Sequence, residues 1–168
     1  IYTTNLRDDI SFIVRQNWMQ IVSLLLPVSV LSHRTALETG ISPRGNIYVS
    51  GAYPRTLKLH DITIVQKLGA GPIEGDSPLL DLFLPSRARA FLENLSSARV
   101  RARGESKNVS REEVERRLVN HLDRHGEPGL NQWRDTAKKV APLRDMEKRV
   151  FCARQPDRDT AGDKYGNS

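Results

Sequence analysis

The sequence contains a single cysteine, Cys152, among its 168 residues. This number excludes an internal disulfide and a cysteine-rich zinc site, and it is typical of the reducing cytoplasm. Long apolar runs are also missing, because Ser23, Pro27 and Ser29 interrupt the longest one, at residues 21–31. That run is far shorter than the roughly 20 residues that span a bilayer, and it lacks the features of a signal peptide. We therefore expect a cytoplasmic protein that does not contact the membrane.

The charge is unevenly distributed along the chain, whose formal net charge is +6. Residues 1–97 hold 9 basic and 8 acidic residues, whereas residues 98–168 hold 17 and 12. A basic second half permits contact with nucleic acid or with an acidic partner. A solvated helical surface is the plainer interpretation of the same excess. The first residue is Ile1 rather than Met, so we also expect the chain to be a piece of a longer protein.

Residues 1–97 predict an α+β domain in which helices pack on a small, mainly antiparallel sheet. Apolar residues at helical spacing predict a first helix that begins near Asp8 or Asp9 and ends before Pro27. A short helix should follow from Ser32, as its N-cap, to Gly40, as its left-handed final residue. Alternating and β-branched residues predict strands at 46–50, 56–59, 62–65 and 82–84, with a tight turn at residues 60–61. A third helix should begin after Pro85, with its inward face formed by Ala88, Phe91, Leu92 and Leu95.

The second half of the chain is predicted to consist of a linker, a helical extension and a tail. Residues 98–108 are basic and poor in apolar residues, which predicts an exposed linker. Ser110 and Glu113 form a capping-box pattern at the start of a helical extension over residues 109–151. Gly126 and Pro128 should interrupt it, and another helix is expected after Pro142. Residues 152–168 are polar and aperiodic, so we expect them to be disordered.

Three patterns suggest chemistry, and each has a plainer explanation. His121 and His125 are four residues apart, the spacing that lets two imidazoles bind one metal, but surface histidines near a helix end are favoured because a third ligand is missing. The glycines of residues 69–75 miss the dinucleotide fingerprint by one residue, which favours a surface loop. Ser32 and His33 are adjacent but lack an orienting carboxylate, so a capping role for Ser32 is favoured over catalysis.

A family resemblance is carried by residues 31–40, LSHRTALETG, and by NIYV at residues 46–49. These two segments resemble the AbiEi-type antitoxins of type IV toxin–antitoxin systems, which show a helix of the pattern S-(H/R)-x-(S/T)-A-L…G leading into a sheet. Residues 85–95, PSRARAFLENL, are similar to that family's strand and R-A-x-L-E-x-L helix. Residues 2–6 and the helices at 110–150 are closer to the N-terminal region of certain bacterial Fic-family proteins. The resemblance covers residues 1–151.

The resemblance implies a regulatory region that follows a winged helix, lying before Ile1, and precedes a Fic domain. A Fic domain carries an H-x-F-x-(D/E)-G-N-G-R loop whose histidine is the base for AMP transfer. Gly166 and Asn167 have neither the histidine upstream nor the arginine downstream, so that activity is not carried over to this chain. Codons for residues 156–163, read one nucleotide later, can encode the apolar helix LIGTLLGT that such relatives have here. We therefore expect a frame shift near Cys152 that removes the Fic domain.

The leading prediction is a non-catalytic regulatory or interaction module, without cofactor or metal, whose partner is a protein or the missing Fic domain. One alternative is a DNA-binding regulator of a toxin–antitoxin operon, which would use the basic linker and the absent winged helix. A second alternative, an AMP transferase, is disfavoured because the Fic motif is missing. The candidate partner-binding residues are Arg34, Arg44, Arg99, Arg101 and Arg103.

Overall fold

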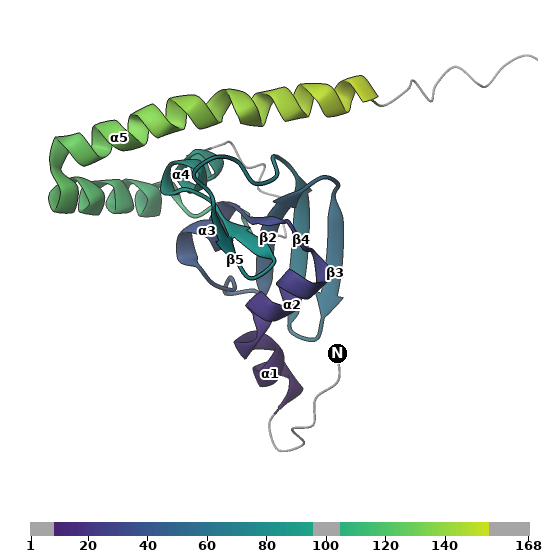
Figure 1. Ribbon diagram of the computed structural model, residues 1–168. Helices are drawn as coiled ribbons and strands as arrows, with labels where there is room; N and C mark the ends of the chain where they lie inside the picture. The colour runs from purple at the N-terminus through teal and green to yellow at the C-terminus, as the bar shows by residue number, and fades with distance from the viewer. Residues whose placement is uncertain (1–8, 96–104, 155–168) are drawn as a thin grey trace, which may run out of the picture.

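The computed structural model describes residues 9–95 and 105–154, with the course of the backbone alone for residues 143–154 (Figure 1). Short helices and a sheet form the body of this part, and a long kinked helix follows. The predicted α+β class is therefore confirmed. The elements in order are α1 (Ile10–Gln16), α2 (Trp18–Leu25), β1 (Val30–Leu31), α3 (His33–Glu38), β2 (Asn46–Gly51), β3 (Arg55–Leu59), β4 (Ile62–Leu68), β5 (Ser77–Leu79), β6 (Leu82–Leu84), α4 (Arg87–Leu95) and α5 (Arg111–Arg154).

The six strands form one sheet in the order β3-β4-β2-β1-β6-β5. The predicted turn at residues 60–61 joins β3 and β4 as an antiparallel pair. Strand β4 lies between β3 and β2 and is parallel to β2. The pair β1–β6 is also parallel, while β1–β2 and β5–β6 are antiparallel. Three of the five pairings are therefore antiparallel, as predicted, and the longest one, β2–β4, is parallel.

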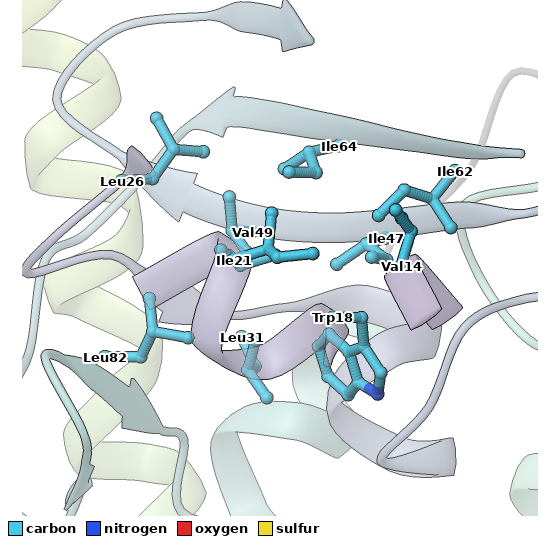
Figure 2. Packing of buried hydrophobic residues seen from close by; sticks show 11 residues of the cluster. Val14, Trp18, Ile21, Leu26, Leu31, Ile47, Val49, Ile62, Ile64 and Leu82 are labelled. Atoms are coloured by element: carbon cyan, nitrogen blue, oxygen red, sulfur yellow. The ribbon is translucent and has the colours of Figure 1, made fainter. Parts of the chain in front are cut away.

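The predicted first helix is two helices, α1 and α2, which cover one face of the sheet. Asp9 caps α1 as predicted, since its carboxylate accepts a hydrogen bond from the backbone N–H of Ser11 at 3.3 Å. Asn17 interrupts the helix, and its side-chain amide donates to the carbonyl of Ile13 at 2.8 Å. An asparagine that competes in this way for a backbone carbonyl weakens a helix interior. The core beneath these helices comprises Val14, Trp18, Ile21, Val22, Leu26, Leu31, Ile47, Val49, Ile62, Ile64 and Leu82 (Figure 2).

Strand β2 is buried on both faces because helices lie on both sides of it. Ile47 and Val49 join the core beneath α1 and α2. The alternate residues Tyr48 and Ser50 belong to the opposite face, since successive side chains of a strand point in opposite directions. The backbone N–H of Tyr48 donates to Oγ1 of Thr35 on α3 at 2.9 Å. This second face holds α3 and α4.

The inward face of α4 is more polar than predicted. Ala88 and Phe91 are buried as expected, but Leu95 is 58% exposed. Arg89 is completely buried and forms ion pairs with Asp76 at 2.6 Å and with Glu93 at 3.2 Å. Its remaining hydrogen bonds reach Ser50 Oγ at 3.2 Å and the carbonyls of Ala70 at 2.6 Å and Gly71 at 2.8 Å. Because every partner is a full or partial negative charge, this guanidinium joins α4, β2 and the loop before β5.

Helix α3 depends on α4 for its capping. Ser32 occupies the N-cap position, but its hydroxyl makes no capping hydrogen bond, so the predicted role of that side chain is wrong. The carboxylate of Glu93 accepts a hydrogen bond from the backbone N–H of His33 at 3.1 Å instead. At the other end, Thr39 adopts the left-handed conformation that was predicted for Gly40. The buried pair Arg89–Glu93 therefore also fixes the start of α3.

The predicted exposed linker is wrong for residues 105–108, which lie against the α+β body. The side chain of Glu105 is 8% exposed and pairs with Arg34 at 2.9 Å. It also accepts hydrogen bonds from the Ser42 hydroxyl and from the Asn46 amide, the latter at 2.9 Å. Burial, the largest single influence, raises the pKa of Glu105, but these hydrogen bonds and Arg34 together lower it. Asn108 is buried as well, so this segment is a strap that holds the start of α5 in place.

Helix α5 begins as predicted, with the hydroxyl of Ser110 accepting a hydrogen bond from the backbone N–H of Glu113 at 3.2 Å. It kinks at Gly126, where φ is 63° and ψ is −172°. The second part then turns back over α4 (Figure 1). The helix continues through Pro142, so no separate helix begins there, and it includes Cys152–Arg154, which were expected in the tail. The rest of the predicted tail lies outside the described residues.

The Arg89→Met substitution tests the importance of the buried guanidinium. Removing it leaves two buried carboxylates without their cation, and breaking a buried ion pair costs about 3–5 kcal/mol. We expect the free energy of unfolding, measured by urea denaturation, to fall by about that amount. Arg87→Met on the same helix is the control, because Arg87 is exposed. It should change the free energy by less than about 0.5 kcal/mol. Equal effects of the two substitutions would contradict this account.

The Glu105→Gln substitution tests the strap. We expect it to lower the free energy of unfolding by about 2 kcal/mol at pH 7, because hydrogen bonds to a charged group are lost. The lowered pKa of Glu105 means that its carboxylate stabilises the fold above the unfolded-state value of about 4.3 and ceases to do so as the pH falls through the folded-state pKa. The difference between the variant and the parent chain should therefore shrink below about pH 4. Glu115→Gln, at an exposed pair with Arg111, is the control.

Candidate functional site

A groove of 960 Å³ lies between α4 and the two parts of α5, and the end of α3 and residues 75–86 contribute to its edge. The turn at Gly126 creates it, because the second part of α5 returns over the side of α4 that the first part follows. Its apolar lining includes Phe91, Leu37 and Trp133, which belong to one small hydrophobic cluster. The rings of Phe91 and Trp133 are 4.7 Å apart. The groove is therefore held between the body and the helical extension.

The lining of the groove carries charge of one sign. Neither Asp nor Glu occurs among the described lining residues. The basic residues that line it are Arg87, Arg116, Arg117, Arg124, His121 and His125. A concave surface lined by charge of one sign concentrates ligands of the opposite sign. The arrangement is suited to holding an anion.

The arginines of the groove differ in how far they are neutralised. Glu113, one turn before them, pairs with Arg116 at 2.6 Å and with Arg117 at 2.5 Å. Hydrogen bonds from these two guanidinium groups lower the pKa of Glu113. Arg87 and Arg124 are exposed, and neither pairs with an acidic residue within the described parts of the chain. Arg87 on α4 and Arg124 on α5 are therefore the cations with the most charge to offer a ligand.

The expectation of two surface histidines is wrong for His121, which is only 9% exposed. Its ring stacks on Trp133, with the centroids 3.7 Å apart and the planes 13° from parallel. The ring of His125 is 4.5 Å away. Neither ring nitrogen of His121 has a hydrogen-bond partner among the described residues. Helical spacing could not show this burial, because Trp133 covers His121 only after the turn at Gly126.

The other chemical patterns do not meet in this groove. No group of three His, Cys, Asp or Glu side chains able to hold a metal ion occurs in the described part of the chain. The glycine-rich loop supplies the carbonyls of Ala70 and Gly71 to Arg89, so it has a structural role. Ser32 is completely buried at the start of α3 and does not line the groove.

The predicted partner-binding arginines lie elsewhere. Arg34 pairs with Glu38 at 3.2 Å and with Glu105, so its charge is used within the fold. Arg44 is exposed but does not line the groove, and its backbone N–H donates to Glu105. Arg99, Arg101 and Arg103 lie outside the described residues. The cationic face of α5 was not predicted, although Arg116, Asn120 and Arg124 recur at the four-residue spacing that places side chains on one face of a helix.

None of the helices in the described ranges combines the length with the apolar character that crossing a membrane requires.

The chain matches no protein-family model, no curated protein and no solved structure.

Proposed function

We propose that this chain is a non-catalytic interaction module that holds an acidic segment of a protein partner in the groove between α4 and α5. The observation that carries the proposal is the lining of the groove, which presents arginines and histidines from two helices without a carboxylate among the described lining residues. Arg87 and Arg124 lack acidic partners within the described ranges. A carboxylate-bearing ligand would supply the missing charge, and arginine binds carboxylates in a two-pronged geometry.

The shape of the groove favours a chain segment over duplex DNA. A volume of 960 Å³ falls at the upper end of the roughly 300–1,000 Å³ of ligand pockets. Reading a duplex requires a helix or ribbon that protrudes into a groove about 12 Å wide, whereas these arginines face a concavity. Single-stranded nucleic acid is bound largely by stacking on open aromatic faces. Phe91 is 8% exposed and one face of Trp133 is covered by His121, so neither of these two rings offers a fully open face for stacking.

The family resemblance supports the same class of partner. The AbiEi-type and Fic-type relatives that the sequence resembles imply a regulatory region that restrains another domain or protein. A groove that accepts an acidic segment provides a physical means for such restraint. The partner in this proposal is therefore either a separate protein or the Fic domain that such relatives carry.

DNA binding is the second candidate function, because the net charge of +6 and the arginine-rich helix also favour phosphate contacts. The two candidate functions predict different effects of salt concentration and of ligand shape on the binding affinity. Phosphate contacts release counterions, so the logarithm of a DNA-binding constant falls steeply with the logarithm of salt concentration. A duplex oligonucleotide titrated at low salt should bind more weakly than an acidic peptide if the groove takes a chain segment.

The Arg124→Glu substitution tests the proposed function with acetyl-hexaglutamate amide as the probe. Arg124→Glu places a carboxylate in the groove, so we expect the affinity for the fluorescently labelled peptide, measured by anisotropy, to fall about tenfold or more. Arg134→Glu is the matched control, because Arg134 lies on the second part of α5 and does not line the groove. It should change the affinity less than about twofold, as exposed charges away from a site contribute little.

Two outcomes would contradict the proposal. Equal losses in Arg124→Glu and Arg134→Glu would mean that the peptide responds to net charge and not to the groove. Binding of duplex DNA that is tighter than peptide binding at the same salt concentration, and that Arg124→Glu abolishes, would favour the DNA-binding alternative.

A further inference from the structure

The two histidines that line the groove differ in their access to water. His121 is buried, and its ring is stacked on Trp133. His125, one helical turn further along α5, is exposed and lines the same groove. The centroids of the two imidazole rings are 4.5 Å apart. His125 is therefore the histidine that a ligand in the groove can reach without any rearrangement of the fold.

The charged groups that line the groove around His125 are all basic. In the described part of the chain they are Arg87 from α4 and Arg116, Arg117, Arg124 and His121 from α5. The edge contributed by α3 and residues 75–86 is uncharged, and so are the lining residues of the second part of α5. Asp123 and Glu127 are close to His125 in sequence, but neither belongs to the lining. A bound anion would therefore bring the groove a negative charge that its described lining does not supply.

A carboxylate in the groove would favour the protonated form of the His125 ring, because an opposite charge close to a titratable group favours its charged form. Such a preference is reciprocal, so the protonated ring binds the carboxylate more tightly than the neutral ring does. Histidine ordinarily titrates near pH 6.5 and glutamate near pH 4.3. The ring thus gains its proton in a pH range where the carboxylates of an acidic segment stay charged.

We propose that His125 is a pH-dependent binding residue of the groove, which takes up a proton when the acidic segment binds and donates a hydrogen bond to one of its carboxylates. The inference rests on the proposed function, because it concerns the occupant of the same groove. Affinity is highest below the titration range of the ring, where the ring already carries its proton. It falls as the pH rises through that range, because the proton must then be taken from the solution. The arginines keep their charge throughout, so binding is weakened and not abolished.

The experiment measures the affinity for fluorescently labelled acetyl-hexaglutamate amide by anisotropy, at about pH 6 and about pH 8 and at one ionic strength. We expect the parent chain to bind about fivefold more tightly at the lower pH, since histidine is the side chain whose charge changes in this range. His125→Gln keeps a hydrogen-bond donor but does not titrate, so its affinity should change less than about twofold between the two pH values.

The control substitution is His60→Asn, in the turn between β3 and β4. His60 is exposed and does not line the groove, and its φ of 41° is one that asparagine tolerates. This variant should keep the pH dependence of the parent chain. Titration calorimetry near pH 7, in two buffers with different heats of ionisation, should also show proton uptake on binding by the parent chain and less uptake by His125→Gln.

The pattern of results separates the two proposals. Equal affinity of the parent chain at both pH values, or an undiminished pH dependence in His125→Gln, overturns the role of His125 and leaves the proposed function intact. Loss of the pH dependence in His60→Asn does the same, because the effect would then follow net charge. A parent chain that binds no peptide at either pH overturns the proposed function, and the role of His125 with it.

Discussion

The structure depends on the burial of one cation. Arg89 is inaccessible to water, and its position is tolerable only because Asp76, Glu93 and three further acceptors surround it. Removing a guanidinium from water is costly unless the partners are all present at once. The loop before β5, strand β2 and helix α4 therefore cannot move independently. Because Glu93 also accepts from the start of α3, the same network sets the direction of both helices that lie on this face of the sheet.

The network around Arg89 fixes α4, and the position of α4 in turn determines the shape of the groove. Asn94, one residue after Glu93, accepts a hydrogen bond from the backbone N–H of Val109 at 3.0 Å, just before α5 begins. On the other side of the strap, Glu105 joins residues of α3 and β2. The first part of α5 is thus positioned by α4 and by the strap together. Its second part, after Gly126, contacts α4 through the ring of Trp133, which lies against Phe91.

Sequence patterns predicted the features that depend on residues close together in the chain. The alternation of residues 46–50 and 62–65 identified β2 and β4, and Gly126 marked the kink, because these signals lie within a few residues of each other. The insertion of β4 beside β2 could not be predicted, since it depends on a pairing between strands. The burial of Arg89 was not predicted, because its partners Asp76 and Ser50 lie on other elements of the chain. The groove was missed for the same reason: its cations meet only after the chain turns at Gly126.

The distribution of ion pairs along α5 connects stability to the proposed role. Glu113 neutralises Arg116 and Arg117, and Glu115 pairs with Arg111, so this helix uses acidic residues where they stabilise it. Arg124 lacks such a pair among the described residues and faces the same groove as Arg87, although like charges that share a concave surface repel one another. Helix α4, which carries Arg87, is joined to β2 and to the loop before β5 by the bonds of Arg89. Arginines that are already in position bind an anion at a lower entropic cost. In the proposed role, Arg89 contributes to this by fixing α4, which forms one side of the groove.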